Sequence, residues 1–156
     1  MRVAITGATG FIGTGLRHAL ADAGIDYVVV TRNPDKAREH CPKAAGVIEW
    51  DPPASGPEPE AFNGLDGIFH IAGSTIAKRW TSKTKQTIRD SRVASTRLLV
   101  ESIRKCSLPP KTLISSSAIG YYGPSDDTPL NETAPAGSDF LARLCRDWEA
   151  ESARAR

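Results

Sequence analysis

Short apolar runs rich in β-branched residues alternate with longer polar stretches of helical periodicity along this chain. The runs have the length and composition of buried strands, and they lie at 3–5, 27–31, 47–50, 67–73 and 112–115. Helical spacing of apolar positions predicts helices at 13–23, 81–105 and 140–153. Pro-rich and Gly-rich loops are expected at 52–59 and 124–137. This alternation predicts an α/β fold with a parallel sheet in a single domain over residues 1–156.

Three glycines with a spacing of three follow the first predicted strand and open the first predicted helix. Strand, glycine turn and helix form the context of a dinucleotide-binding fingerprint. Gly7 allows the sharp turn, Gly10 lets a pyrophosphate approach the backbone, and Gly13 lets the helix pack closely on the sheet. The alternative is a glycine turn with a purely structural purpose. The residues predicted to hold the pyrophosphate are Gly7, Thr9, Gly10, Phe11, Ile12 and Gly13.

The end of the second predicted strand bears on the choice between NAD and NADP. An NAD site usually carries an acidic residue here for the ribose 2′-hydroxyl. This chain has Thr31 and Arg32 instead, while Asp26 comes too early and Asp35 lies beyond a proline. An arginine can bind a 2′-phosphate through charge-assisted hydrogen bonds, and Thr31 can add a hydroxyl. We therefore expect NADP as the cofactor, with NAD as the second choice; a solvated Arg32 without a ligand is the alternative.

Polar and small residues at two further strand ends are also candidate cofactor neighbours. Asp51 can face the adenine or simply cap a turn. Ala72, Gly73 and Ser74 leave room for a flat ligand against the backbone. His70 lies between apolar residues in the same strand, which favours a hydrogen-bonded core histidine over a catalytic one.

The predicted helix 81–105 carries small residues between its apolar positions, which favours close packing on the protein's own sheet, with an oligomer face as the alternative. Its basic residues are interpreted as a solvated face: Lys83, Lys85, Arg89, Arg92 and Arg97. After the fifth predicted strand, Ser116 and Ser117 can orient a substrate hydroxyl or carbonyl beside a nicotinamide, or can merely cap a turn.

Composition indicates which kinds of binding partner and which cellular compartment to expect. The 156 residues are 40% apolar and 24% charged, with a formal net charge of +2. These values predict a globular protein without a nucleic-acid or membrane partner. Three widely spaced cysteines, no metal-ligand cluster and no signal peptide predict a cytoplasmic protein with reduced thiols and no metal site.

The sequence resembles the extended short-chain dehydrogenase/reductase superfamily, in particular its atypical epimerase branch of nucleoside-diphosphate-sugar epimerases. The resemblance rests on TGATGFIG at 6–13, FHIAG at 69–73, SSSAIGYYG at 115–123 and RDWEAE at 146–151. It implies a Rossmann-type doubly wound parallel sheet that binds a nicotinamide dinucleotide.

Active members of this superfamily place a serine or threonine beside a Tyr-x-x-x-Lys motif. The resemblance assigns the serine to Ser117 or Ser116, but the tyrosine and lysine positions hold Leu141 and Cys145. Tyr121 or Tyr122 can act as proton carrier in their place, although neither has a lysine four residues later.

Extended members are also longer than this chain. We therefore expect a sheet truncated before the last strands and the substrate subdomain, with the C-terminal substrate-binding part absent. An unpaired sheet edge favours association with another chain, such as a homo-oligomer.

Two hypotheses of function follow. The first is an NADP(H)-binding epimerase or reductase-type domain that transfers hydride at a hydroxyl or carbonyl carbon of a small molecule such as a nucleotide sugar. The second is a non-catalytic NADP-binding module with a redox-responsive regulatory or interaction role.

Overall fold

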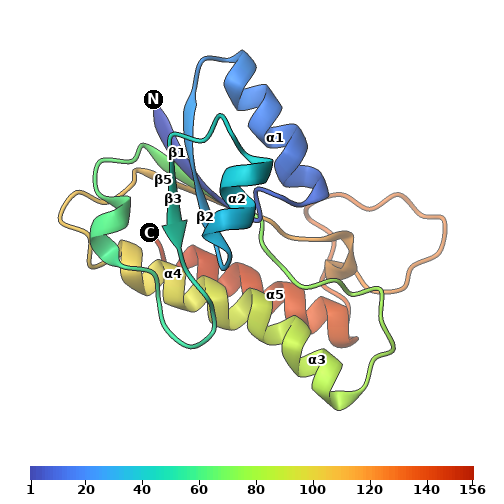
Figure 1. Cartoon of the computed structure of the whole chain (residues 1–156). Helices are drawn as coiled ribbons and strands as arrows, with labels where there is room; N and C mark the ends of the chain where they lie inside the picture. Colours follow the sequence, from blue (N-terminus) through green and yellow to red (C-terminus); the bar gives the residue numbers. More distant parts are fainter.

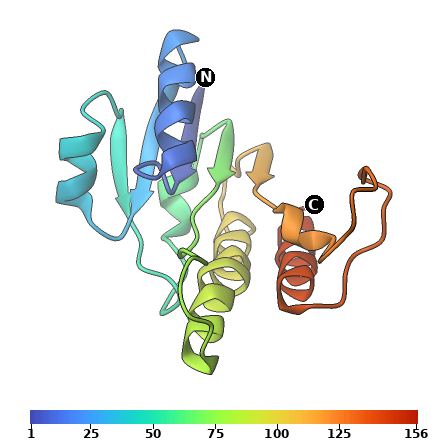
Figure 2. The same ribbon diagram turned by 90° about the vertical axis from the view of Figure 1, so that its right-hand side faces the viewer.

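A computed structural model describes all residues 1–156 and contains one parallel sheet in the order β3-β2-β1-β4-β5. Figure 2 shows the strands side by side from β3 at the left to β5 at the right. The strands are β1 (Arg2–Thr6), β2 (Asp26–Thr31), β3 (Gly46–Glu49), β4 (Gly67–His70) and β5 (Thr112–Ser115). Their carboxyl ends are in register, since Thr6 pairs with both Val30 and His70, and His70 pairs with Ser115.

Helices cover both faces of the sheet, as expected for a doubly wound fold (Figure 1). The helices α1 (Phe11–Asp22) and α2 (Pro34–His40) lie on one face, and α3 (Ser82–Arg89), α4 (Ser95–Ile103) and α5 (Phe140–Ala153) lie on the other. Short helical turns are η1 (Pro59–Phe62), η2 (Asp90–Ala94, a π-helical turn) and η3 (Ile119–Tyr121). No helix has both the length and the apolar character needed to cross a membrane.

Alternation along β1 and β2 sends successive side chains to opposite cores. Ala4, Val28 and Val30 pack against α4 and η1 with Phe62 and Leu99. On the opposite face, Val3, Ile5 and Val29 pack with Leu20 of α1 and Ala37 of α2. The two buried clusters fix the register of the central strands, because a slip by one residue would exchange the faces.

The predicted strands and the long helices are confirmed, with three differences. Strand β4 ends at His70, so Ala72 to Ser74 form a loop. The helix α2 was not predicted, although Pro34 and the Asn33 side chain, which accepts from the Lys36 amide at 2.9 Å, form a regular start. The predicted helix 81–105 is interrupted by η2, whose wider turn changes the direction in which residues 90–94 project.

The basic residues of this long helix form the predicted solvated face only in part, since Lys83 and Arg97 are exposed and Lys85, Arg89 and Arg92 are half-buried. Arg89 is paired with Asp147 at 2.6 Å, and Arg97 is paired with Glu151 at 2.6 Å, which ties α3 and α4 to α5. Arg92 is half-buried and points toward the loop after β4. The interpretation was wrong for Arg92 and missed the ion pairs of Arg89 and Arg97, because helical periodicity alone does not show that α5 packs along the same face.

The turn after β1 depends on two glycines. Gly7 has φ +73°, which is unfavourable for a side chain, and an added Cβ would lie 3.0 Å from the Ala72 backbone. At Gly13 an added Cβ would lie 2.3 Å from the Gly7 carbonyl oxygen and 2.7 Å from the Ala8 Cα. Helix α1 therefore reaches its position against the turn only because position 13 has no side chain.

A buried polar network joins the ends of β1 and β4 to α4. The Thr6 hydroxyl oxygen accepts from the amides of Ile71 at 3.1 Å and Ala72 at 3.2 Å, so its own hydrogen is donated to Nδ1 of His70 at 2.9 Å. Nε2 of His70 then carries the ring proton and donates to the Thr96 hydroxyl at 2.9 Å. His70 is the predicted core histidine, fully buried and satisfied at both nitrogens.

We predict that Gly13→Ala destabilises the fold by about 1–3 kcal/mol, because the new methyl group overlaps backbone atoms that cannot move independently. Gly15 is the matched control in the same helix, since it is exposed and an added Cβ meets nothing within 4 Å. Gly15→Ala should stabilise by about 0.5–1 kcal/mol. Urea unfolding of the two variants checks this, and equal effects would contradict the packing argument.

We also predict an acid-sensitive stability that originates at His70. Burial lowers the pKa of His70 to about 4, whereas an unfolded histidine titrates near a pKa of about 6.5. Between these values the unfolded chain binds a proton that the folded chain does not, so stability falls as the pH falls. His70 accounts for a loss of about 2 kcal/mol between pH 7 and pH 5. Urea unfolding at both values should show a smaller fall in His70→Gln, and an equal fall would contradict the assignment.

Candidate functional site

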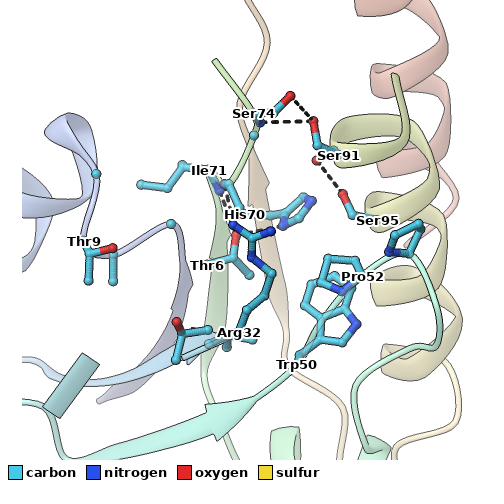
Figure 3. Close-up of a pocket in the computed structure, with 18 of the residues that line it drawn as sticks. Thr6, Thr9, Arg32, Trp50, Pro52, His70, Ile71, Ser74, Ser91 and Ser95 are labelled. Carbon is cyan, nitrogen blue, oxygen red and sulfur yellow. Dashed lines mark hydrogen bonds between the residues drawn. The ribbon is translucent and has the colours of Figure 1, made fainter. Parts of the chain in front are cut away.

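A cavity of about 580 Å³ opens at the carboxyl ends of β1 and β4. The chain runs outward from β1 to β2 and β3 on one side, and to β4 and β5 on the other. This reversal is the topological switch point at which open α/β sheets bind ligands. The strand ends, the loops that follow them and one helix junction enclose the cavity, as Figure 3 shows.

The glycine turn forms one wall, with Gly7, Thr9 and Gly10 among the lining residues. An added Cβ at Gly10 would meet only the Gly7 carbonyl oxygen, at 3.3 Å, and would otherwise face open space. Helix α1 begins here without a side-chain cap or an acidic residue in its first turn, whereas α2, α3 and α5 each begin with a capping side chain. Its first free amides, with the positive end of the helix dipole, suit an anion such as a pyrophosphate.

The other predicted pyrophosphate residues lie just outside this cavity. Phe11 and Ile12 are 98% and 67% exposed and line a shallow hollow on the outer side of the same turn. Their side chains therefore do not fill the cavity, and any contact they make with a ligand there is through backbone amides. Gly13 is buried against the turn.

Arg32 projects from the end of β2 into the cavity, with Thr9 on one side of it and Trp50 and Pro52 on the other (Figure 3). Its guanidinium has no salt bridge or hydrogen bond within the protein. Thr31 also lines the cavity, but its hydroxyl accepts the Asn33 amide at 3.2 Å and so shapes the turn. Of the two, Arg32 has the free donors that a phosphate requires.

The loop after β4 forms the opposite wall, and Ala72, Gly73 and Ser74 all line the cavity. The Ser74 amide donates to the Ser91 hydroxyl at 3.0 Å, which fastens the loop to η2 (Figure 3). Asp51 is exposed and makes no side-chain hydrogen bond. It does not line the cavity, although its neighbours Trp50 and Pro52 do.

Several lining residues were not identified from the sequence. The sequence predicts a strand end at Trp50 and a loop at the prolines after it, but its pattern does not indicate that these residues fold over the cavity. The π-helical turn and the residues beside it add polar side chains to the lining. In the sequence, the small residues among them indicate only close helix packing. These lining residues are Trp50, Pro52, Pro53, Thr87, Asp90, Ser91 and Ser95.

The four candidate catalytic residues lie together beside α5 and outside the lining of the cavity. The Ser116 amide donates to the His70 carbonyl at 3.1 Å, which continues the sheet pairing beyond β5. The Ser117 hydroxyl donates to the Glu149 carboxylate. Tyr121 and Tyr122 are half-buried in and after η3, with their rings edge to face at 5.3 Å. Glu149 was not identified from the sequence as a partner of this cluster.

The positions that correspond to the missing tyrosine and lysine face this region as well. Leu141 packs beneath Gly120, where an added Cβ would lie 3.0 Å away. The Cys145 thiol points to the Ala118 carbonyl at 3.8 Å, and burial raises the pKa of this thiol. Neither position carries the phenol or the ammonium group of the Tyr-x-x-x-Lys motif.

The chain is similar in sequence to a known protein family and to several of its members. The profile of the NAD dependent epimerase/dehydratase family matches residues 3–155. The epimerase family protein YfhF of Bacillus subtilis is 38% identical over 152 residues, which cover 97% of this chain and 49% of that protein. The epimerase family protein Mb2239 of Mycobacterium bovis is 36% identical over 149 residues, covering 94% and 46%. The chain thus spans about half the length of these relatives.

A solved structure supports the same relationship. The crystal structure of the human epimerase family protein SDR39U1 with NADPH superposes with a TM-score of 0.79 at 32% identity, covering 97% of this chain and 48% of that one. The nucleoside-diphosphate sugar epimerase of Corynebacterium glutamicum superposes with a TM-score of 0.76 at 34% identity, covering 99% and 31%. Fold, glycine turn and family profile agree, and the chain belongs to the NAD dependent epimerase/dehydratase family.

Proposed function

We propose that this chain is an NADP(H)-binding domain of an epimerase or reductase. The observation that carries the proposal is the unpaired Arg32 guanidinium inside a cavity at the switch point of the sheet. An arginine without an acidic partner at the end of β2 fits a 2′-phosphate and offers no acceptor for a 2′-hydroxyl. The presence of NADPH in the human relative supports the same choice.

The lining residues fit the parts of a dinucleotide in order. Arg32 would hold the adenosine 2′-phosphate, with Trp50 available for the adenine. The free amides after Gly10 would hold the pyrophosphate. The nicotinamide nucleotide would then extend toward the loop Ala72 to Ser74, which is the remaining wall.

The reaction we propose is hydride transfer at a hydroxyl or carbonyl carbon, and the bound dinucleotide would supply or accept the hydride. Ser117 would orient the substrate oxygen, and its hydroxyl already has Glu149 as proton acceptor. A nucleotide-linked sugar is the substrate class that the name of the Corynebacterium relative supports.

A non-catalytic NADP-binding module is the second candidate. It is favoured by the position of Ser116, Ser117, Tyr121 and Tyr122, none of which lines the cavity. The lack of a tyrosine and lysine at 141 and 145 favours it as well. The two candidates differ in turnover and share the same cofactor binding.

We predict that Arg32→Ala weakens NADPH binding by about 1.5–3 kcal/mol and leaves NADH binding nearly unchanged, because only NADPH carries the 2′-phosphate. Isothermal titration calorimetry with each cofactor measures this. Arg38→Ala is the matched control, since Arg38 lies nearby in α2 but is paired with Asp35 at 2.9 Å. An equal loss for both cofactors in Arg32→Ala would refute the phosphate assignment.

We predict that Ser117→Ala abolishes NADPH oxidation with carbonyl substrates without changing the Kd for NADPH, because Ser117 lies outside the cavity. Ser115→Ala is the control in the same segment, and it should retain turnover. Tight NADPH binding by the wild type without turnover on any carbonyl of a broad panel would instead support the non-catalytic module.

A further inference from the structure

Arg92 places a positive charge behind the loop after β4, and this loop forms one wall of the cavity. Its Nη1 donates to the Ser74 carbonyl at 3.0 Å. Three atoms of the guanidinium lie 2.9–3.2 Å from the position that a Cβ would take at Gly73. Gly73 and Ser74 both line the cavity, so the charge of Arg92 stands directly behind that wall.

This charge has no acidic partner, although it is half-buried. Each acidic side chain of η2 and α5 accepts hydrogen bonds from residues other than Arg92. Asp90 accepts from Gln86, and Glu149 accepts from Ser117. Asp147 is paired with Arg89, and Glu151 is paired with Arg97 and Arg154. The remaining neighbours of Arg92 are neutral. They are the Trp148 ring, 5.5 Å from the guanidinium carbon, and the Cys145 thiol.

Burial lowers the pKa of the Arg92 guanidinium, as expected for a cation held away from water without a counterion. The guanidinium nevertheless stays charged at neutral pH, because arginine ordinarily loses its proton only in strongly basic solution. No ion pair neutralises this charge, so a ligand group in this part of the cavity is exposed to the positive field of Arg92.

The redox state of a nicotinamide dinucleotide changes its charge at one end. The oxidised ring is positively charged and the reduced ring is neutral. Under the proposed function, on which this step rests, the adenosine half lies at Arg32 and the nicotinamide half at Ala72 to Ser74. Arg92 then repels the oxidised ring and leaves the reduced ring unaffected.

We infer that Arg92 makes this site favour the reduced dinucleotide, NADPH, over NADP⁺. The site is thereby suited to reducing a carbonyl group. The carbonyl carbon receives the hydride and the carbonyl oxygen receives a proton, so that an alcohol and the oxidised dinucleotide leave.

Asp90 carries a negative charge, opposite in sign to that of Arg92, and this gives a second variant with which to test the inference. Its carboxylate lines the same end of the cavity, and Gln86 donates to it at 2.7 Å. Its negative charge favours the oxidised ring. Neutralising Asp90 and neutralising Arg92 should therefore move the preference in opposite directions.

The experiment is a calorimetric titration of the whole chain with NADPH, NADP⁺ and 2′,5′-ADP, which carries the 2′-phosphate but no nicotinamide. In Arg92→Gln the ratio of Kd for NADP⁺ to Kd for NADPH should fall by about threefold to tenfold. Arg92→Lys should retain the ratio and Asp90→Asn should increase it. Arg89→Gln is the matched control one helical turn away, and it should leave the ratio unchanged. Binding of 2′,5′-ADP should be the same in all variants.

An unchanged ratio in Arg92→Gln, or an equal loss of all three ligands, would overturn the inference and leave Arg92 as a brace for the loop after β4. In both cases the wild type still binds NADPH, so the proposed function stands. If the wild type binds none of the three ligands, the proposed function fails and this inference fails with it.

Discussion

The Thr6 hydroxyl is the point on which the arrangement of the site depends. It accepts two amides from the loop after β4 and donates to His70, which in turn donates to Thr96 of α4. One buried oxygen thus fixes the end of β1, the course of the loop after β4 and the distance to α4. These hydrogen bonds would be costly to lose, because Thr6, His70 and Thr96 are buried and the two loop amides are partly so. The cavity lies directly above this junction.

The second constraint is the requirement for glycine in the turn between β1 and α1. The turn between β1 and α1 needs a left-handed residue at Gly7 and no Cβ at Gly13, where the helix touches the turn. The same arrangement leaves the start of α1 without a capping side chain. Gly7 and Gly13 allow the close approach, and Gly10 at the N-cap leaves the first amides of α1 without a side-chain partner, so one glycine motif provides both features.

Charge is distributed unevenly around the cavity. Two basic residues of the long helix, Arg89 and Arg97, are paired with α5, and these pairs hold α3 and α4 against α5. Arg32 and Arg92 lack acidic partners, one at the open mouth of the cavity and one behind its far wall. Unpaired cations at opposite ends suit a ligand that is strongly anionic at one end and changes charge at the other. Under the proposed function, this distribution would connect cofactor choice with redox preference in one site.

The sequence by itself determined most of the strand and helix pattern and the glycine turn, and it identified Arg32 and Ala72 to Ser74 as candidate site residues, because each depends on local periodicity or on residues close to a strand end. It also identified His70 as a core residue from its apolar neighbours. Only the tertiary structure decided that Trp50, Pro52 and the π-helical turn close the cavity, that Ser117 meets Glu149, and that Arg92 lies behind Gly73. These contacts join segments far apart in the chain, and a helix pattern does not reveal a π turn or which neighbour will cover a basic residue.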